Sequence, residues 1–179
     1  MGTSPLEPEA ELRRYIRDIP DFPKPGILFR DLTPLLANPA ALKLAIQALA
    51  EPFTEARIDY VVGTEARGFI FGAPVALTLD VGFIPVRKPG KLPGETISAS
   101  YELEYGTDHV EMHVDALSAN DRVLVVDDLI ATGGTAQATV ALVRQVGATV
   151  AGCAFLIELS FLEGRKLVDV EPFHSVIRY

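Results

Sequence analysis

One stretch in the second half of the chain, residues 123–135, constrains the fold most strongly. It reads VLVVDDLIATGGT. Its first four residues are all apolar, which predicts a strand buried on both faces, since such strands carry continuous rather than alternating apolar residues. Residues 136–147 then show apolar residues at helical spacing and end in Gly147, which predicts a helix closed by glycine. We therefore expect the glycine turn between the carboxyl end of a strand and the amino end of a helix.

A junction of this kind is suited to an anion. Its backbone N–H groups have no helical partner, and the helix dipole adds roughly half a positive charge. The glycines let the backbone approach a phosphate closely, and the threonine hydroxyls add donors. We therefore expect a phosphate to be held by Ala131, Thr132, Gly133, Gly134 and Thr135. The alternative is an ordinary turn in which Thr132 caps the helix.

Two adjacent carboxylates, Asp127 and Asp128, precede this turn. They would repel a phosphate, so they need another partner. Carboxylates accept hydrogen bonds, and a vicinal diol offers two donors at a suitable separation, whereas Mg²⁺ offers charge. A ribose 5-phosphate satisfies both halves of the stretch. The alternative is that the two aspartates are solvated.

The rest of the chain alternates between helix and strand patterns. Residues 4–20 predict a helix closed by Pro20, and the prolines and glycine of residues 21–31 argue against a regular element across most of that segment. Asn38 and Pro39 are typical of a helix start. Residues 60–63 and 81–86 read as strands, with a helix at 69–79 between them. This alternation predicts an α/β fold with a parallel sheet that binds ligands at the carboxyl ends of its strands.

Basic residues follow two of these strands. Arg67 lies in the turn after residues 60–63, and Arg87, Lys88 and Lys91 follow residues 81–86. The position after a strand predicts that these cations bind a diphosphate, and the arginines can do so bidentately. The alternative is a solvated basic loop.

Residues 94–114 alternate with period two and break near Gly106. This pattern predicts a hairpin outside the main sheet, and such a hairpin can close over a site and exclude water. The alternative is a β excursion without such a role. His109 and His113 lack the glutamate of a zinc-binding helix, so we interpret them as surface residues of the hairpin.

Length and charge exclude several classes of protein. A chain of 179 residues predicts one domain, 1–179. A net charge of −8 argues against nucleic acid or an anionic membrane as partner. The single cysteine, Cys153, cannot form an internal disulfide and lies in an apolar run, which favours a buried thiol in a cytoplasmic protein. No apolar stretch approaches the roughly 20 residues that span a bilayer.

The stretch at residues 123–135 resembles the phosphoribosyl diphosphate signature of the type I phosphoribosyltransferases. Four further segments resemble the adenine-specific branch of that family: DFPKPGILFRD at 21–31, GTEARGF at 63–69, RKPGKLP at 87–93 and LEYG at 103–106. The resemblance implies the family's fold, a mostly parallel central sheet flanked by helices. It also implies an N-terminal hood at about residues 18–38 and a flexible β-hairpin lid at about 94–114.

The same resemblance implies roles for individual residues. Phe29 would stack on adenine, the backbones of Leu28 and Arg30 would bind its edge, and Leu159 would pack on its other side. Arg67, Arg87, Lys88 and Lys91 would bind diphosphate, with the contribution of each subunit left open. The implied catalytic residues are Glu104, Tyr105 and Arg67, and Glu104 is the best candidate to move a proton on the purine.

The implied reaction joins adenine to phosphoribosyl diphosphate and gives AMP and diphosphate, in a homodimer that requires Mg²⁺. The metal would be held mainly by the substrate, with Asp127 and Asp128 as further possible ligands. Two alternatives stay open: an oxo-purine such as hypoxanthine, guanine or xanthine as the base, or a regulator that senses phosphoribosyl diphosphate. The acidic charge and the lack of spare length argue against such a regulator.

Overall fold

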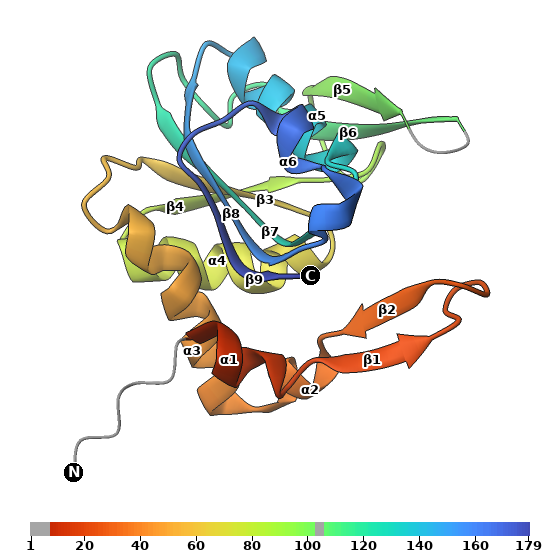
Figure 1. Ribbon diagram of the computed structural model, residues 1–179. Coiled ribbons are helices and arrows are strands. Elements are labelled where there is room, and N and C mark those ends of the chain that lie inside the picture. Colours follow the sequence, from red (N-terminus) through yellow and green to blue (C-terminus); the bar gives the residue numbers. More distant parts are fainter. Residues whose placement is uncertain (1–7, 103–105) are drawn as a thin grey trace.

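A five-stranded sheet forms the centre of the computed structural model, which describes residues 8–102 and 106–179 (Figure 1). The strand order is β4-β3-β7-β8-β9, and each neighbouring pair is parallel. The strands are β3 (Tyr60–Thr64), β4 (Gly82–Val86), β7 (Arg122–Ile130), β8 (Thr149–Glu158) and β9 (Phe173–Arg178). The expected α/β class with a parallel sheet is confirmed.

Helices cover both faces of this sheet. One face packs against α1 (Pro8–Arg13), α2 (Thr33–Ala37), α3 (Pro39–Ala50) and α4 (Arg67–Leu79), and the other packs against α5 (Gly134–Gln145) and α6 (Arg165–Val168). Two short 3₁₀ helices, η1 (Glu51–Phe53) and η2 (Ser160–Leu162), follow α3 and β8. This layering gives the described chain an apolar core beneath α3 and α4 and two further apolar clusters on the α5 side.

The position of β7 between helices on both faces of the sheet explains why the first part of its sequence is continuously apolar. Leu124 and Val126 join the core beneath α3 and α4, whereas Val123 and Val125 join the cores on the α5 side. Successive residues of a strand point to opposite faces, so both faces here need apolar side chains. Cys153 on β8 is fully buried, and burial raises the pKa of its thiol to about 12, so it is a packing residue.

The first hairpin corrects one expectation. The helix predicted over residues 4–20 is only the short α1 within the described residues, and β1 (Arg17–Pro20) pairs antiparallel with β2 (Leu28–Asp31). Cross-strand pairing competes with the helix here, because Arg17 forms an ion pair with Asp31 (Nη2–Oδ2 2.6 Å) and Arg30 pairs with Asp18. We call β1, β2 and their connection the hood hairpin.

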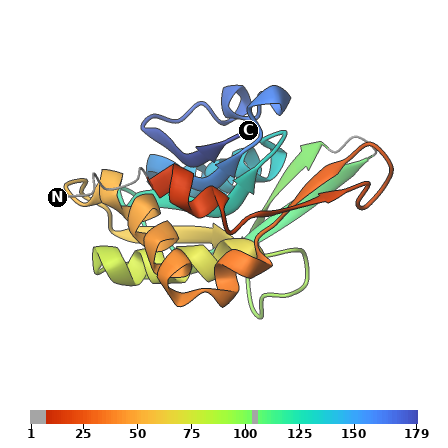
Figure 2. The ribbon, with the colours of Figure 1, turned by 60° about the horizontal axis from the view of Figure 1, so that its bottom comes forward.

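A second hairpin lies outside the sheet, as expected. Strands β5 (Thr96–Glu102) and β6 (Thr107–His113) form a separate two-stranded antiparallel sheet, which we call the lid hairpin. The hood and lid hairpins extend from the same side of the molecule in two views (Figures 1 and 2). His109 is exposed, and a ring nitrogen of His113 lies 2.6 Å from the carbonyl of Pro93, so both are surface residues of the hairpin.

The start of α3 agrees with its sequence. The side chain of Asn38 accepts hydrogen bonds from the backbone N–H groups of Ala40 and Ala41, both at 3.0 Å, and Pro39 opens the helix. Within the described part of the chain, no helix is both long and apolar enough to cross a membrane.

Candidate functional site

A pocket of about 380 Å³ lies at the carboxyl ends of β3 and β7. Two turns that follow neighbouring parallel strands line it, together with one residue of the lid hairpin. The lining residues are Glu65, Ala66, Arg67, Tyr101, Asp127, Asp128, Leu129, Ile130, Ala131, Thr132, Gly133, Gly134, Thr135 and Ala136. The residues expected to hold ribose 5-phosphate are therefore brought together, with Arg67 beside them.

Asp127 and Asp128 lie within β7 rather than in the turn after it. The strand continues to Ile130 because Leu129 and Ile130 keep their pairing with Ile157 and Glu158 of β8. Asp128 is only 5% exposed, and Asp127 keeps some surface open to the pocket. The two carboxylates are thus fixed by a sheet strand, with Asp128 buried and Asp127 partly open to the pocket.

Asp128 has spare capacity to accept hydrogen bonds. Its Oδ2 lies 2.9 Å from Nε of Arg67, close enough for an ion pair. The orientation does not make a hydrogen bond, so this buried oxygen lacks a hydrogen-bond donor among the described residues. A buried acceptor without a donor is costly unless a ligand supplies one.

Burial raises the pKa of both carboxyl groups. For Asp127 the desolvation effect is largest and the charge of Asp128 adds to it, so its pKa lies well above the usual 3.8. For Asp128 desolvation again dominates, and the charge of Arg67 offsets only part of it. Two adjacent buried acids therefore favour a ligand that donates hydrogen bonds or carries positive charge.

The glycine turn is held against another part of the backbone. Gly133 has a φ of +88° and directly precedes α5, so a residue with a side chain would be strained there. Gly164, which precedes α6, packs against this turn: a Cβ on Gly164 would lie 2.2 Å from the carbonyl oxygen of Ala131 and 2.8 Å from the nitrogen of Gly133. The start of α5 has no side-chain cap within the described chain, so the alternative role for Thr132 is wrong.

Two buried threonines connect the turns on either side of the pocket. The hydroxyls of Thr64 and Thr139 lie 3.1 Å apart, and Thr139 donates to the carbonyl of Thr135 at 2.9 Å. Thr64 ends β3 just before the Glu65 turn, and Thr135 is in the first turn of α5. The hydrogen bonds thus join the two loops that line the pocket.

Arg67 lies between the carboxylates and the hood hairpin. It begins α4 directly after a cis peptide bond between Glu65 and Ala66. Its guanidinium carbon lies 5.9 Å from the centre of the Phe29 ring. Gly68 leaves room for Asp127, because a Cβ there would lie 2.7 Å from Oδ1.

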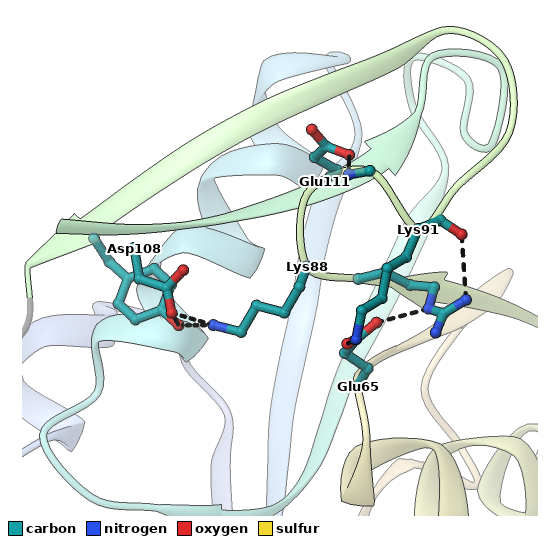
Figure 3. A network of polar contacts seen from close by, with 8 residues as sticks. Glu65, Lys88, Lys91, Asp108 and Glu111 are labelled. Atoms are coloured by element: carbon teal, nitrogen blue, oxygen red, sulfur yellow. Dashed lines mark hydrogen bonds and ion pairs between the residues drawn. The ribbon is translucent and has the colours of Figure 1, made fainter.

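The cations after β4 contact carboxylates. Arg87 donates through Nε to Glu65 Oε2 at 2.7 Å, and Nζ of Lys91 lies 2.5 Å from Glu65 Oε1 (Figure 3). Burial would raise the pKa of Glu65, but hydrogen bonds from Lys91 and Arg87 outweigh it and leave the pKa below its usual value. None of the three cations after β4 is among the described residues that line the pocket, although Glu65 is.

Lys88 joins the basic loop to the lid hairpin. Its Nζ lies 2.5 Å from the hydroxyl of Tyr101 on β5 and also pairs with Asp108 on β6 (Figure 3). Burial would lower the pKa of Lys88, but the hydrogen bonds that it donates to Asp108 and Tyr101 leave the pKa raised. We call Lys88, Tyr101 and Asp108 the lid clasp.

The residues expected to bind adenine lie beside the pocket rather than in its lining. Phe29 is on β2, where its ring makes an edge contact with Phe22 (centroids 5.1 Å apart). Leu28 is exposed, and the Arg30 side chain is 14% exposed. Leu159 follows β8, and its backbone N–H donates to the carbonyl of Ile130, a lining residue, at 3.0 Å. Glu104 and Tyr105 fall outside the described residues.

Sequence reasoning missed three site residues. Tyr101 is buried against Gly134, and its inward position in an alternating strand was the available signal. Glu65 was quoted as part of a turn, but its role as the partner of two cations needs the fold. Gly164 carried no local signal, since it contacts the glycine turn from 31 positions away.

The donor set fits Mg²⁺ only when the substrate completes the coordination. No group of three or more acidic, histidine or cysteine side chains that could hold a metal occurs in the described part of the chain. Asp127 and Asp128 nevertheless offer buried carboxylate oxygens, one of which lacks a donor. Mg²⁺ is commonly held by one or two carboxylates together with substrate phosphates, so the pair fits it in that way.

Known proteins resemble this chain over most of its length. The family described as "Phosphoribosyl transferase domain" matches residues 31–171. An adenine phosphoribosyltransferase of Thermobifida fusca is 61% identical over 159 residues, which cover 88% of this chain and 90% of that protein. One of Methylococcus capsulatus is 60% identical over 169 residues, covering 94% and 99%.

Solved structures agree with these matches. The adenine phosphoribosyltransferase of Rhodothermus marinus has a TM-score of 0.91 and 56% identity, covering 96% of this chain and 98% of that one. The enzyme of Saccharomyces cerevisiae, solved with adenine and an imino-altritol bisphosphate, has a TM-score of 0.89 and 46% identity, covering 94% and 98%. The similarity therefore extends to a protein solved with adenine bound.

Proposed function

Because the chain belongs to the adenine phosphoribosyltransferases of the phosphoribosyl transferase domain family, we propose that it transfers the 5-phosphoribosyl group from phosphoribosyl diphosphate to N9 of adenine. The products are AMP and diphosphate, a purine salvage reaction. One observation carries the proposal: two adjacent carboxylates, one of them buried with an acceptor that lacks a donor, share a pocket with a glycine turn at a helix start. A molecule that carries both a diol and a phosphate would satisfy the carboxylates and the glycine turn together.

The ribose 5-phosphate is bound by β7 and the turn after it. Asp127 and Asp128 accept hydrogen bonds from the ribose hydroxyls, which removes the cost of their burial. The backbone N–H groups of residues 131–135 and the hydroxyls of Thr132 and Thr135 donate to the phosphate. The pocket that these residues line supports this assignment.

Diphosphate is bound by cations at the other end of the pocket. Arg67 begins α4 beside Asp128, so it reaches both the ribose and the leaving group. Arg87 and Lys91 contact Glu65 at the edge of the pocket and would exchange that carboxylate for diphosphate oxygens. Lys88 would have to leave the lid clasp to do the same.

Adenine lies between the hood hairpin and the segment after β8. Phe29 stacks on one face of the base, the backbones of Leu28 and Arg30 bind its edge, and Leu159 packs on the other face. Two contacts support this arrangement: Arg67 lies near the Phe29 ring, and Leu159 is hydrogen-bonded to the carbonyl of the lining residue Ile130.

The reaction needs charge stabilisation at both ends of a breaking bond. The bond from C1 to the diphosphate lengthens first, and the sugar becomes oxocarbenium-like, as in glycosyl transfer generally. Arg67 and the other cations offset the charge that develops on the leaving group. Mg²⁺ would neutralise further charge on the diphosphate, held by substrate oxygens with Asp127 or Asp128.

N9 of adenine attacks the sugar from the face opposite the diphosphate. Glu104 would assist as a carboxylate that accepts the proton leaving N7 as N9 attacks, with Tyr105 as its neighbour in the sequence. A carboxylate accepts a proton more readily when its pKa is raised toward neutral pH, and exclusion of water around it would raise that pKa. If Glu104→Gln and Glu104→Ala both keep near-normal turnover, this role is wrong.

We also propose a homodimer in the cytoplasm, with residues 1–179 forming a single domain. Exposed apolar side chains on α4 support the dimer: Leu77 is 81% exposed and Ile70 is 40% exposed, and their spacing of seven residues places them on one face. Sedimentation of the purified protein measures the oligomeric state directly.

The activity itself is tested by product analysis. The purified protein is incubated with Mg²⁺ and phosphoribosyl diphosphate, with adenine, hypoxanthine or guanine in parallel, and the nucleotides are separated. We expect AMP from adenine and little product from the other bases. If a nucleotide forms from hypoxanthine or guanine instead, the assigned base is wrong. If no nucleotide forms from any base but calorimetry shows that phosphoribosyl diphosphate binds, the result favours a sensor over an enzyme.

A further inference from the structure

Tyr179 contacts both sides of the proposed adenine site. Its ring lies under the guanidinium of Arg30 on the hood hairpin, with the guanidinium carbon 3.8 Å from the ring centre. Its backbone carbonyl accepts a hydrogen bond at 2.9 Å from the N–H of Ser160, the residue after Leu159. One residue beyond β9 thus connects the hood hairpin to the segment that carries Leu159.

The contact with Arg30 is protected from solvent. The Arg30 side chain is 14% exposed and also pairs with Asp18 on β1, so its position is fixed within the hood hairpin. A guanidinium over an aromatic ring contributes more when it is desolvated. Tyr179 itself is partly buried and packs against the core beneath α3 and α4. The core therefore supports the ring on which the hood hairpin rests.

The geometry of a strand makes this contact relevant to the base. Phe29 and Arg30 are neighbours on β2, so their side chains point to opposite sides of the hairpin. Arg30 faces Tyr179, and Phe29 faces Arg67 at the edge of the pocket. Moving Arg30 would therefore tilt the same strand that carries Phe29.

The other side of the base site depends on Tyr179 through the backbone. The N–H of Tyr179 donates to the carbonyl of Glu158, and its carbonyl accepts from Ser160, both at 2.9 Å. These two hydrogen bonds flank Leu159, which is itself bonded to Ile130 at the pocket. The position of Leu159 is thus fixed by backbone bonds that do not depend on the Tyr179 side chain.

We propose that Tyr179 is a positioning residue that sets the spacing between Phe29 and Leu159 and thereby the affinity for adenine. This inference rests on the proposed adenine site. The backbone of Tyr179 holds the Leu159 side, and its ring holds the hood side. Substituting the ring consequently affects only the hood side, whereas the bonds that place Leu159 are kept.

The test compares two substitutions in the full chain. Tyr179→Phe keeps an aromatic face under Arg30, and Tyr179→Leu keeps apolar bulk without it. We expect Tyr179→Leu to raise the KM for adenine roughly five- to thirtyfold, the range that a partly to fully desolvated cation–π contact covers. The KM for phosphoribosyl diphosphate and the kcat stay within about twofold, and Tyr179→Phe behaves as wild type.

Arg13→Gln is the matched control. Arg13 on α1 also stacks on the Tyr179 ring, at 4.3 Å from its centre, but it is not part of the hood hairpin. We expect its loss to leave the KM for adenine within about twofold. An increase as large as that of Tyr179→Leu would overturn the proposal, because general loosening around the ring would then explain both.

Hydrogen exchange provides a readout independent of turnover. In Tyr179→Leu, the amides of the hood hairpin, residues 17–31, exchange faster than in wild type, and those of β3 and β7 do not. Unchanged hood exchange together with an unchanged KM for adenine overturns the proposal. Phe29→Ala distinguishes a failure of the Tyr179 proposal from a failure of the proposed adenine site. If Phe29→Ala raises the KM for adenine and Tyr179→Leu does not, only the role of Tyr179 is wrong. If neither substitution raises it, the proposed adenine site itself is wrong.

Discussion

At the scale of single residues, Gly164 has an ordinary backbone conformation and still has no room for a side chain. Its φ of −58° and ψ of −28° suit any residue at a helix start. Replacing glycine by alanine at such a position usually stabilises a protein by about 0.4–1 kcal/mol. Here the new methyl group would press against Ala131 and Gly133, so the sign of the effect should reverse.

We expect Gly164→Ala to weaken binding of phosphoribosyl diphosphate. Overpacking costs about 1–3 kcal/mol, which displacement of the phosphate turn would convert into roughly a five- to hundredfold higher KM. Steady-state kinetics with each substrate varied in turn measures this. The KM for adenine serves as the internal control, and a parallel rise in both KM values would contradict a local effect on the turn.

A second prediction at this scale concerns Asp127. Burial and the charge of Asp128 raise its pKa above 3.8, so the ionised carboxylate costs stability at neutral pH. Asp127→Asn should therefore raise Tm, by about 2–4 °C for each kcal/mol relieved. It should also reduce kcat/KM roughly ten- to hundredfold, because a charged acceptor for ribose is lost.

The effect of Asp127→Asn on Tm should depend on pH. A raised pKa favours the folded state at low pH, and this contribution is lost as the pH rises from about 3.8 through the folded-state pKa. The Tm difference between variant and wild type should widen over that interval and then stay constant. Thermal melts from pH 4 to pH 8 test this, and a gap that narrows with pH would be the contrary result.

The sequence predicts some of these residues better than others. Asp127, Asp128 and the glycine turn lie in one short stretch, so the sequence alone predicts their chemistry. The structure brings them together in one pocket. Gly164 and Tyr179 act through contacts with residues far away in the chain. No local pattern encodes such contacts, because a glycine or a tyrosine has the same propensities wherever it packs.

At the scale of secondary structure elements, the lid hairpin is fastened by the lid clasp. Tyr101→Phe removes the hydroxyl shared with Lys88 and Asp108 but keeps the ring against Gly134. We expect β5 and β6 to exchange their amide hydrogens about fivefold faster, since one such hydrogen bond contributes about 1 kcal/mol. Hydrogen exchange read by mass spectrometry measures it.

Tyr60→Phe is the control for the lid clasp. Tyr60 begins β3, at the opposite end of the strand from the pocket, so its hydroxyl is remote from the clasp. This substitution should leave lid exchange unchanged. Equal exchange of β5 and β6 in Tyr101→Phe and wild type would mean that packing against α5 alone holds the lid hairpin.

Elements differ in how far their sequence determines them. The sequence predicts β3, β4, β7 and the start of α3, because apolar runs and an Asn-Pro start leave direct signals. The prediction of a helix over residues 4–20 is wrong because the last four of these residues form β1. This strand pairs with β2, and Arg17 forms an ion pair with Asp31. The helical spacing of apolar residues does not indicate that a partner strand, β2, begins 11 residues after the start of β1.

At the scale of the whole molecule, substrate binding should stabilise the fold. A ligand that binds only the folded state adds about 2.7 kcal/mol at a concentration of 100 times its Kd. For a chain of 179 residues this corresponds to a rise in Tm of about 5–10 °C. Differential scanning calorimetry with phosphoribosyl diphosphate and Mg²⁺ measures it, and ribose without phosphate is the control.

The bonds between Thr64, Thr139 and Thr135 have a consequence for the choice of substrate. They join the turn that bears Arg67 to the first turn of α5, through side chains that are fully or almost fully buried at Thr64 and Thr139. The separation of the two proposed phosphate-binding ends is therefore set by the core and not by the ligand. If both ends bind as proposed, a sugar donor one carbon longer between its two phosphates should not fit this fixed distance, however well each end matched.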